Sequence, residues 1–367
     1  MFFFVIFIIV AFCSYWEILG SLRENAKRKM FLFLFGGFYL LSFLRWEYGT
    51  DWSGYYLHFE IYNSWDSLDQ QEFIYIFVLL FAKSIINDYT FVLFCFATIL
   101  FFFQIKGVSK LSILPLTSLF VLTGTYFCYV GFVRQHIAVV IAFYSLIYIR
   151  ERRFVPFIIC FILAFGLHYS ALVFLPAYWI YNLKFSRKQL FCFLLISMFL
   201  SSVMMLLLQS VGDVIGITSI AARSEGYLDQ GYDYEDDTML DPRQLIIKAC
   251  LNRGVVILII FYLFDKIRKS DSWSFYNGLF NLYFFGTILF FMSSPLHITL
   301  TRMSWYYDFS QVLIIPALFA YTQKKYTKFV FFCIMTVYLA GRLYLSVNAY
   351  EGDNSYKFIP FIENMLV

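Results

Sequence analysis

Long apolar segments, separated by short charged loops, occupy most of this 367-residue sequence. A helix of about 20 apolar residues crosses the hydrocarbon layer of a bilayer and satisfies its own backbone hydrogen bonds without water. The composition agrees, because 61% of the residues are hydrophobic and only 14% are charged, against about 25% charged residues in soluble domains. The sequence therefore predicts an all-α, polytopic integral membrane protein that forms one multi-span domain over residues 1–367.

The apolar segments give the positions of the expected spans. Segment 73–105 is interpreted as one long, bent helix interrupted near KSIINDY, and segment 154–182 as a hairpin of two short helices with GLHYS at its tip. With these included, we expect roughly ten to twelve transmembrane helices. The other spans are expected at 2–20, 30–44, 111–129, 131–149, 189–211, 244–264, 273–293, 303–321 and 329–348.

Loop charge predicts the orientation of these spans, because short basic loops stay in the cytoplasm. Two stretches rich in acidic residues then face outward, the outer loop 45–72 and the outer acidic loop 212–243. The basic loops are 23–29, 106–110, 150–153, 184–188, 265–269 and 324–328.

Several classes of function lack support. The net charge of +4 is small, so we expect no nucleic-acid partner. The cysteines lie in apolar runs without CxxC spacing, and the sequence has no HExxH, P-loop or GxSxG motif. Zinc hydrolysis, ATP-driven transport and serine-hydrolase chemistry are therefore not indicated, and we expect neither a cofactor nor a metal.

Arg134 stands at the outer end of an otherwise apolar span. Ala138, Ala142 and Ser145 follow it on one face, and such a stripe of small residues lets another helix approach closely. The guanidinium would then point into the protein, where it can bind phosphate with two parallel hydrogen bonds. The alternative is an interfacial arginine that reaches toward lipid headgroups, and the sequence leaves both interpretations open.

Further polar groups are expected on the outer side. Arg45 and Asp51 follow the second span, and the Gly-Thr-Asp turn at 49–51 either holds a carboxylate in place or marks the end of one helix and the start of another. His168 lies at the predicted hairpin tip beside Ser170. An intramembrane histidine is a candidate base, although many such residues are structural.

Two arginines occur near the later spans. Arg302 opens span 303–321 and is followed by Tyr306, while Arg253 falls well inside span 244–264 and requires an anionic partner there. Cations thus gather at outer helix ends. Their natural common ligand is a polyanion at the membrane boundary, such as a lipid-linked phosphate or pyrophosphate.

The ordered motifs resemble the EpsG family of exopolysaccharide and O-antigen polymerases, which are Wzy-like. The similarity runs from about residue 45 to 360, and the order and spacing of short motifs carry it. The matching pieces are RWEYGTDWSGYY, VRQHIAVVIAFYSLIYI, AFGLHYSALVFLP, TRMSWYYDFSQVLIIP and YKFIP.

This resemblance implies a metal-independent glycosyltransferase that polymerises undecaprenyl-pyrophosphate-linked oligosaccharide repeats for O-antigen (lipopolysaccharide), capsule or exopolysaccharide. It implies a multi-pass protein of the bacterial inner membrane whose active site faces the periplasm or exterior, with membrane lipid and a chain-length regulator protein as expected partners. Acidic loop 212–243 either contacts the particular repeat unit or is a solvated loop without a role. The resemblance to the EpsG family implies these site residues: Arg45, Asp51, Arg134, Gln135, His168, Arg302 and Tyr356.

The resulting hypothesis assigns catalytic roles to His168, Asp51 and Arg134. Arg134 and Arg302 would stabilise the departing pyrophosphate, and either His168 or Asp51 would act as the base. The remaining substrate-binding candidates are Arg45, Gln135, Arg253, Tyr306 and Tyr356. A lipid-linked oligosaccharide flippase or transporter, an O-antigen ligase and a membrane acyltransferase are the alternatives. The repeat-unit sugars, their linkage and the oligomeric state do not follow from the sequence.

Overall fold

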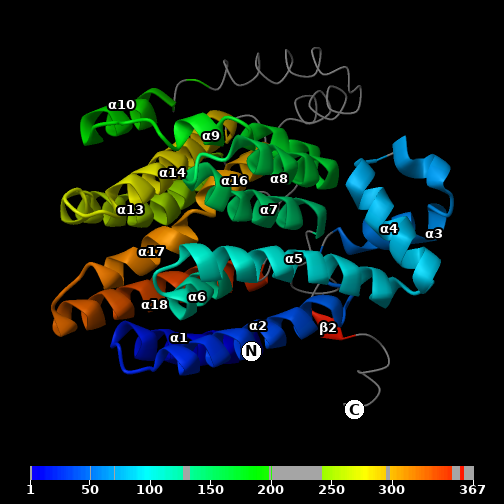
Figure 1. Cartoon of the computed structure of the whole chain (residues 1–367), viewed down its shortest axis with the longest axis horizontal. Helices are drawn as coiled ribbons and strands as arrows, with labels where there is room; N and C mark the ends of the chain where they lie inside the picture. The colour runs from blue at the N-terminus through cyan, green and yellow to red at the C-terminus, as the bar shows by residue number, and fades with distance from the viewer. Residues whose placement is uncertain are drawn as a thin grey trace. The chain divides into compact units, whose positions relative to one another are not determined.

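The computed structural model describes residues 2–49, 51–69, 71–126, 133–197, 200, 242–294, 298–348 and 356–358 (Figure 1). Within these ranges the regular secondary structure is helical apart from one pair of two-residue strands. Three helices in this part of the chain are long and apolar enough to cross a membrane: α5 (Tyr89–Leu111), α14 (Trp273–Ser293) and α18 (Lys325–Asn348). Shorter apolar helices accompany them, and the expected total number of spans stays a prediction.

The chain divides into two compact units. Unit 1 comprises Met1–Ala171 and Ile315–Val367, and unit 2 comprises Leu172–Ile314. The prediction of a single domain over residues 1–367 stays a prediction.

Unit 1 is a bundle in which α1 packs on α6, α2 on α5, α5 on α7, and α7 on α8 (Figure 1). Helices α2 and α5 are antiparallel, because Phe35 contacts Phe101 while Phe43 contacts Phe94. The helices of this unit, besides α5 and α18, are α1 (Phe2–Ile18), α2 (Glu24–Phe43), α3 (Trp52–Ile61), α4 (Phe73–Ile85), α6 (Pro115–Thr125), α7 (Val133–Arg150) and α8 (Phe154–Leu167), with the 3-10 helix η1 (Trp65–Asp69).

A buried carboxylate joins α1 to α6. Glu17 of α1 accepts hydrogen bonds from the backbone N–H groups of Leu116 and Thr117, at 3.1 and 2.8 Å, and from the Thr117 hydroxyl at 2.9 Å. The first N–H groups of a helix lack intrahelical partners and favour negative charge. The residue before α6, Leu114, offers no side-chain cap, so α1 supplies it instead.

The interruption expected near KSIINDY is present, but the expectation of one long, bent helix over 73–105 is wrong. Helices α4 and α5 are separated by residues 86–88, and Asp88 caps α5 by accepting a hydrogen bond from the Phe91 N–H at 3.1 Å. The two helices fold back on each other, since the Tyr75 and Phe96 rings stack at 5.6 Å. The 13-residue α4 is about 20 Å long and too short to span about 30 Å of hydrocarbon. Hydropathy alone did not reveal the reversal, because both helices are apolar.

The chain breaks at GLHYS, as the sequence predicts. Helix α8 ends at Leu167, and the 3-10 helix η3 (Tyr169–Phe174) follows His168. The second arm is not a full helix, which corrects the expectation of a two-helix hairpin: η3 is followed only by the single turn α9 (Ala177–Ile180). Pro176 stands at the N-cap of α9, where a missing N–H costs nothing.

Unit 2 contains α9, α10 (Arg187–Ser197), α13 (Pro242–Ile267), α14, α15 (Ile298–Thr301), the 3-10 helix η4 (Arg302–Ser304) and α16 (Trp305–Asp308). Helix α14 contacts α10, α13, α15, η4 and α16. The span expected at 303–321 stays a prediction; in the structure this segment is divided into η4, α16 and α17 (Gln311–Ala320). Acidic loop 212–243 lies outside the described residues, except that its last two residues begin α13.

Gly286 of α14 allows η4 and α16 to pack closely against this helix. A Cβ atom at this position would lie 2.7 Å from the Cβ atom of Tyr307 and 2.8 Å from Oδ1 of Asp308. We therefore expect Gly286→Ala to lower the free energy of unfolding by about 1–3 kcal/mol, the usual cost of overpacking. The midpoint of thermal unfolding in detergent measures this loss.

Gly254 of α13 provides the matched control, because no atom of the described residues lies within 4 Å of its Cβ position. Alanine is favoured over glycine in an open helix by up to about 1 kcal/mol. Gly254→Ala should thus maintain or raise the unfolding midpoint. Equal midpoints for the two variants would contradict the packing argument.

Candidate functional site

The loop after α2 turns sharply before α3 begins. Gly49 has φ +91°, in the left-handed region that favours glycine. Asp51 occupies the N-cap position of α3, but its side chain makes no capping hydrogen bond. The turn therefore places the Asp51 carboxylate at the head of α3 without using it as a cap.

Arg134, the second residue of α7, forms an ion pair inside unit 1. Its Nη1 lies 2.7 Å from Oε2 of Glu72 and 3.1 Å from Oε1 of Gln71. The Glu72 side chain is fully buried, and that of Arg134 is 17% exposed. The guanidinium thus lies in the protein, where its charge is compensated by a carboxylate.

Two tyrosine rings hold the same guanidinium from the sides. Its central carbon lies 5.3 Å from the Tyr55 ring centroid and 5.0 Å from that of Tyr75, within the range of cation–π attraction. Tyr55 belongs to α3 and Tyr75 to α4. Burial raises the pKa of Tyr55, and the nearby Arg134 charge opposes that rise. Arg134 is therefore fixed by contacts from α3, α4 and the residues just before α4.

Arg45 belongs to a short strand that pairs with a strand more than 300 residues later in the chain. Strand β1 (Arg45–Trp46) pairs antiparallel with β2 (Lys357–Phe358), and Lys357 forms an ion pair of 2.7 Å with Glu47. The Tyr356 hydroxyl donates to the carbonyl of Leu41 at 2.7 Å. The early RWEY motif and the late YKF motif are thus brought together by a two-stranded pairing.

The Arg45 guanidinium is buried among tyrosines. Its side chain donates to the carbonyl of Ser42. Burial lowers the pKa of Arg45, and the tyrosines close enough to oppose this effect are Tyr48, Tyr55, Tyr89 and Tyr356. In the described part of the chain no carboxylate lies within salt-bridge distance of it, and its Nε atom has no hydrogen-bond partner there. Arg45 thus differs from Arg134, because no described carboxylate compensates its charge.

His168 is held by its own turn. Its Nδ1 atom accepts a hydrogen bond from the Ser170 N–H at 3.2 Å and lies 2.7 Å from the Ser170 hydroxyl oxygen. A ring nitrogen that accepts from an N–H carries no proton, so the proton of the neutral ring is on Nε2. Beside it, the Tyr169 hydroxyl donates to the carbonyl of Gln71 at 3.4 Å, which ties the α8–η3 break to the segment that binds Arg134.

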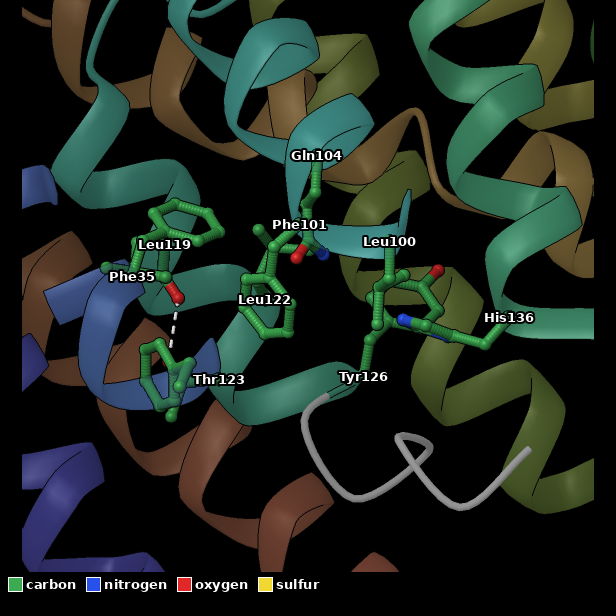
Figure 2. A pocket seen from close by; sticks show the side chains of 10 residues that line it. Phe35, Leu100, Phe101, Gln104, Leu119, Leu122, Thr123, Tyr126 and His136 are labelled. Carbon is green, nitrogen blue, oxygen red and sulfur yellow. Dashed lines mark hydrogen bonds between the residues drawn. The ribbon is translucent and has the colours of Figure 1, made fainter. Parts of the chain in front are cut away.

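The residues after Arg134 face elsewhere. His136 is two residues along α7, about 200° around the helix, and points toward Tyr126 and Leu100 (Figure 2). His136 lines a small pocket together with Gln104, Thr123 and Tyr126, and the other residues of the lining are phenylalanines and leucines. Gln135 is buried beside it on α7. Arg134 and His136 therefore act on different faces of the helix.

Unit 2 contains a second buried ion pair. Arg253 of α13 contacts Oδ2 of Asp308 on α16, and its Nη2 donates to the Ser304 hydroxyl at 2.7 Å. Ser304 in turn donates to Asp308 at 2.7 Å, and the guanidinium lies 3.9 Å from the Phe290 ring centroid. Asp308 supplies the anionic partner that the depth of Arg253 required.

The other unit 2 candidates lie in the divided segment after α14. Arg302 belongs to η4 and is half-buried, whereas Tyr306 of α16 is buried and contacts Phe174.

In unit 1 the structure brings together Arg45, Asp51, Arg134 and Tyr356 around Tyr55 and its neighbours. The described residues contain no group of three or more His, Cys, Asp or Glu side chains able to hold a metal ion.

Three residues were missed by the sequence argument: Glu72, His58 and Asp308. Glu72 is the last charged residue before an apolar run, as Arg134 is the first charged residue of another. Two opposite charges at span boundaries are a usable signal for an ion pair. His58 follows Asp51 by seven residues, which places both on one helix face.

Comparison with known proteins supports the family resemblance that the ordered motifs indicate. A model of the EpsG family matches residues 28–362, nearly the whole chain. A search of curated proteins gave no match, and no solved structure matches.

Proposed function

The chain belongs to the EpsG family, and from this we propose that it is a repeat-unit polymerase at the outer face of the bacterial inner membrane. In the proposed reaction, a growing glycan leaves undecaprenyl pyrophosphate and joins a sugar hydroxyl of an incoming lipid-linked repeat unit. The product is O-antigen, capsule or exopolysaccharide. Membership of this family and the apolar helices support a membrane-embedded enzyme of this kind.

The reaction makes two chemical demands. The bond between the sugar C1 and the pyrophosphate oxygen breaks, so negative charge develops on the leaving pyrophosphate and must be stabilised. The attacking hydroxyl loses a proton, which requires a base. Neither demand needs a nucleotide sugar, and we propose that the reaction also needs no metal.

The buried charge of Arg45, which no carboxylate among the described residues compensates, is the observation that carries this proposal. An unpaired ion in a protein interior costs several kcal/mol, and among the described residues no carboxylate offsets that cost for Arg45. A pyrophosphate would supply the missing negative charge and accept hydrogen bonds from the guanidinium. We therefore propose that Arg45 binds the leaving pyrophosphate. Tyr356 is one of the tyrosines that surround its guanidinium.

Arg134 has a different part in this proposal. Glu72 already compensates its charge and, with Tyr55 and Tyr75, holds its guanidinium in one orientation. A cation held in this way needs no rearrangement when charge develops nearby, which is the basis of electrostatic preorganisation. We propose that Arg134 assists the pyrophosphate site from α7, with Gln135 beside it.

The remaining roles also stay proposals. Arg302, Arg253 and Tyr306 are proposed to bind lipid-linked substrate in unit 2, and acidic loop 212–243 to contact the repeat unit. A chain-length regulator protein is the proposed partner. His168 and Asp51 are the proposed bases from the sequence, although Nδ1 of His168 is engaged by Ser170.

Reconstitution tests the proposed function. Full-length protein in liposomes is incubated with the undecaprenyl-pyrophosphate repeat unit isolated from its own host, with a chelator present, and products are separated by size. A ladder is expected from the wild type and from Arg187→Ala, an exposed residue paired with Asp265. Arg45→Met is expected to reduce the ladder strongly while the folded protein is retained, and Arg134→Lys, which keeps a cation beside the buried Glu72 carboxylate, is expected to reduce it less.

Other outcomes would identify the alternatives. Transport of unpolymerised substrate across the liposome membrane, without a ladder, would support a flippase. Transfer of a single glycan to added lipid A core would support a ligase. Loss of the ladder in chelator, restored by metal, would contradict the metal-independent mechanism.

A further inference from the structure

Helix α3 carries a line of reactive side chains on one face. Asp51, Tyr55 and His58 are separated by four and three residues, the spacing that places side chains one above another on a helix. Tyr55 packs against the Arg134 guanidinium and interacts electrostatically with Asp51. The third member, His58, is half-buried and has no role in the function proposed above.

His58 is connected to the Arg134 site through Tyr75. Its Nδ1 atom lies 3.1 Å from the Tyr75 hydroxyl oxygen, and the Tyr75 ring lies against the Arg134 guanidinium at 5.0 Å. The Tyr62 ring covers the imidazole at a centroid distance of 5.2 Å. Residues of α3 and α4 therefore fix the orientation of the histidine ring. A single side chain, that of Tyr75, contacts both His58 and Arg134.

The Tyr75 hydroxyl can donate to or accept from Nδ1 of His58, and one of these two arrangements suits a base. When Nδ1–H donates to the tyrosine oxygen, the lone pair of the imidazole is on Nε2, at the opposite side of the ring. This is the arrangement in which a third group orients a catalytic imidazole. His168 has the reverse arrangement, because the Ser170 N–H donates to its Nδ1 and leaves the proton on Nε2.

We propose that His58 is the general base of the polymerisation reaction, an inference that rests on the function proposed above. The O–H bond of the attacking sugar hydroxyl breaks, and its proton moves to Nε2 of His58. The hydroxyl oxygen forms the new bond to C1 of the donor sugar. The bond from C1 to the pyrophosphate oxygen breaks, and the leaving undecaprenyl pyrophosphate keeps the electron pair.

A purely structural role is the competing explanation, since the bond between His58 and Tyr75 also joins α3 to α4. Glutamine separates the two explanations. The side chain of His58→Gln can still reach Tyr75 with a hydrogen bond, yet it cannot accept a proton at neutral pH. Tyr75→Phe is the complementary variant, because it removes the hydrogen bond and retains both the ring against Arg134 and the histidine.

The test uses full-length protein in liposomes with the lipid-linked repeat unit, and measures the rate of ladder formation under saturating substrate. General-base catalysis contributes roughly 100- to 10,000-fold, so His58→Gln is expected to lose at least about 100-fold in kcat with KM nearly unchanged. Tyr75→Phe should lose less, since the base remains. Added imidazole should restore part of the activity of His58→Gly and none of the activity of Arg45→Met.

The failures can be told apart. A wild-type protein that binds substrate without extending it would overturn the polymerase function itself. A wild-type ladder accompanied by a His58→Gln rate within threefold of wild type would overturn only the role of His58. Loss in Tyr75→Phe equal to that in His58→Gln, without rescue by imidazole, would assign His58 to structure.

Discussion

Arg45→Met is expected to lower the rate of chain extension by roughly 100- to 1,000-fold, the usual cost of removing one group that stabilises a transition-state oxyanion. The reason is that Arg45 is a buried cation whose charge no carboxylate compensates within the described residues. In this variant the leaving pyrophosphate would lose the positive charge and the hydrogen bonds of the Arg45 guanidinium. Product ladders from reconstituted protein, quantified over time, measure the effect.

The stability of the same variant provides an independent check. Removing an unpaired buried charge eliminates its desolvation cost, so Arg45→Met is expected to keep or raise the midpoint of thermal unfolding. Inorganic pyrophosphate should raise the midpoint of the wild type by mass action and leave the variant unchanged. A strongly destabilised Arg45→Met protein would contradict the interpretation, because it would indicate that Arg45 has a compensating partner.

Asp308→Ala is expected to lower the free energy of unfolding by about 3–5 kcal/mol, the range measured when one partner of a buried ion pair is removed. The substitution leaves the Arg253 guanidinium buried beside Phe290 with its carboxylate gone. It also removes the acceptor of the Ser304 hydroxyl. The midpoint of thermal unfolding in detergent, compared with that of Ser304→Ala, measures the loss.

The double variant Arg253→Met/Asp308→Leu tests the cause. Replacing both members of a buried ion pair with apolar residues is often neutral, so the double variant should be more stable than Asp308→Ala alone. The loss in the double variant minus the losses in the single variants Arg253→Met and Asp308→Leu is the coupling energy that a double-mutant cycle isolates. Strictly additive losses would contradict a direct interaction between the two side chains.

The hydropathy pattern correctly predicted features that depend on a single helix. The expected span 273–293 coincides with α14, and the break at GLHYS coincides with the end of α8 at Leu167. The depth of Arg253 correctly indicated an anionic partner, because an isolated charge at that position is too costly. The same reasoning did not identify Asp308, which is 55 residues away.

Local pattern was misleading where a reversal lay within apolar sequence. Segment 73–105 has the composition of one long helix, yet α4 turns back on α5 at residues 86–88. Hydropathy averages over a window and does not record the direction of the chain. The sequence marks the interruption, near KSIINDY and the cap residue Asp88, but it does not mark the reversal of direction.

The sequence by itself determined the class of protein and its family, because hydrophobic length and ordered motifs are properties of the chain read in one dimension. Only the tertiary structure decided the electrostatics of the arginines. Arg134 is paired with Glu72, which is 62 residues away, whereas Arg45 has tyrosines around it and no such partner in the described part of the chain. Whether a buried charge is compensated depends on which distant side chain packs within about 4 Å of it, and that distance is set by the fold.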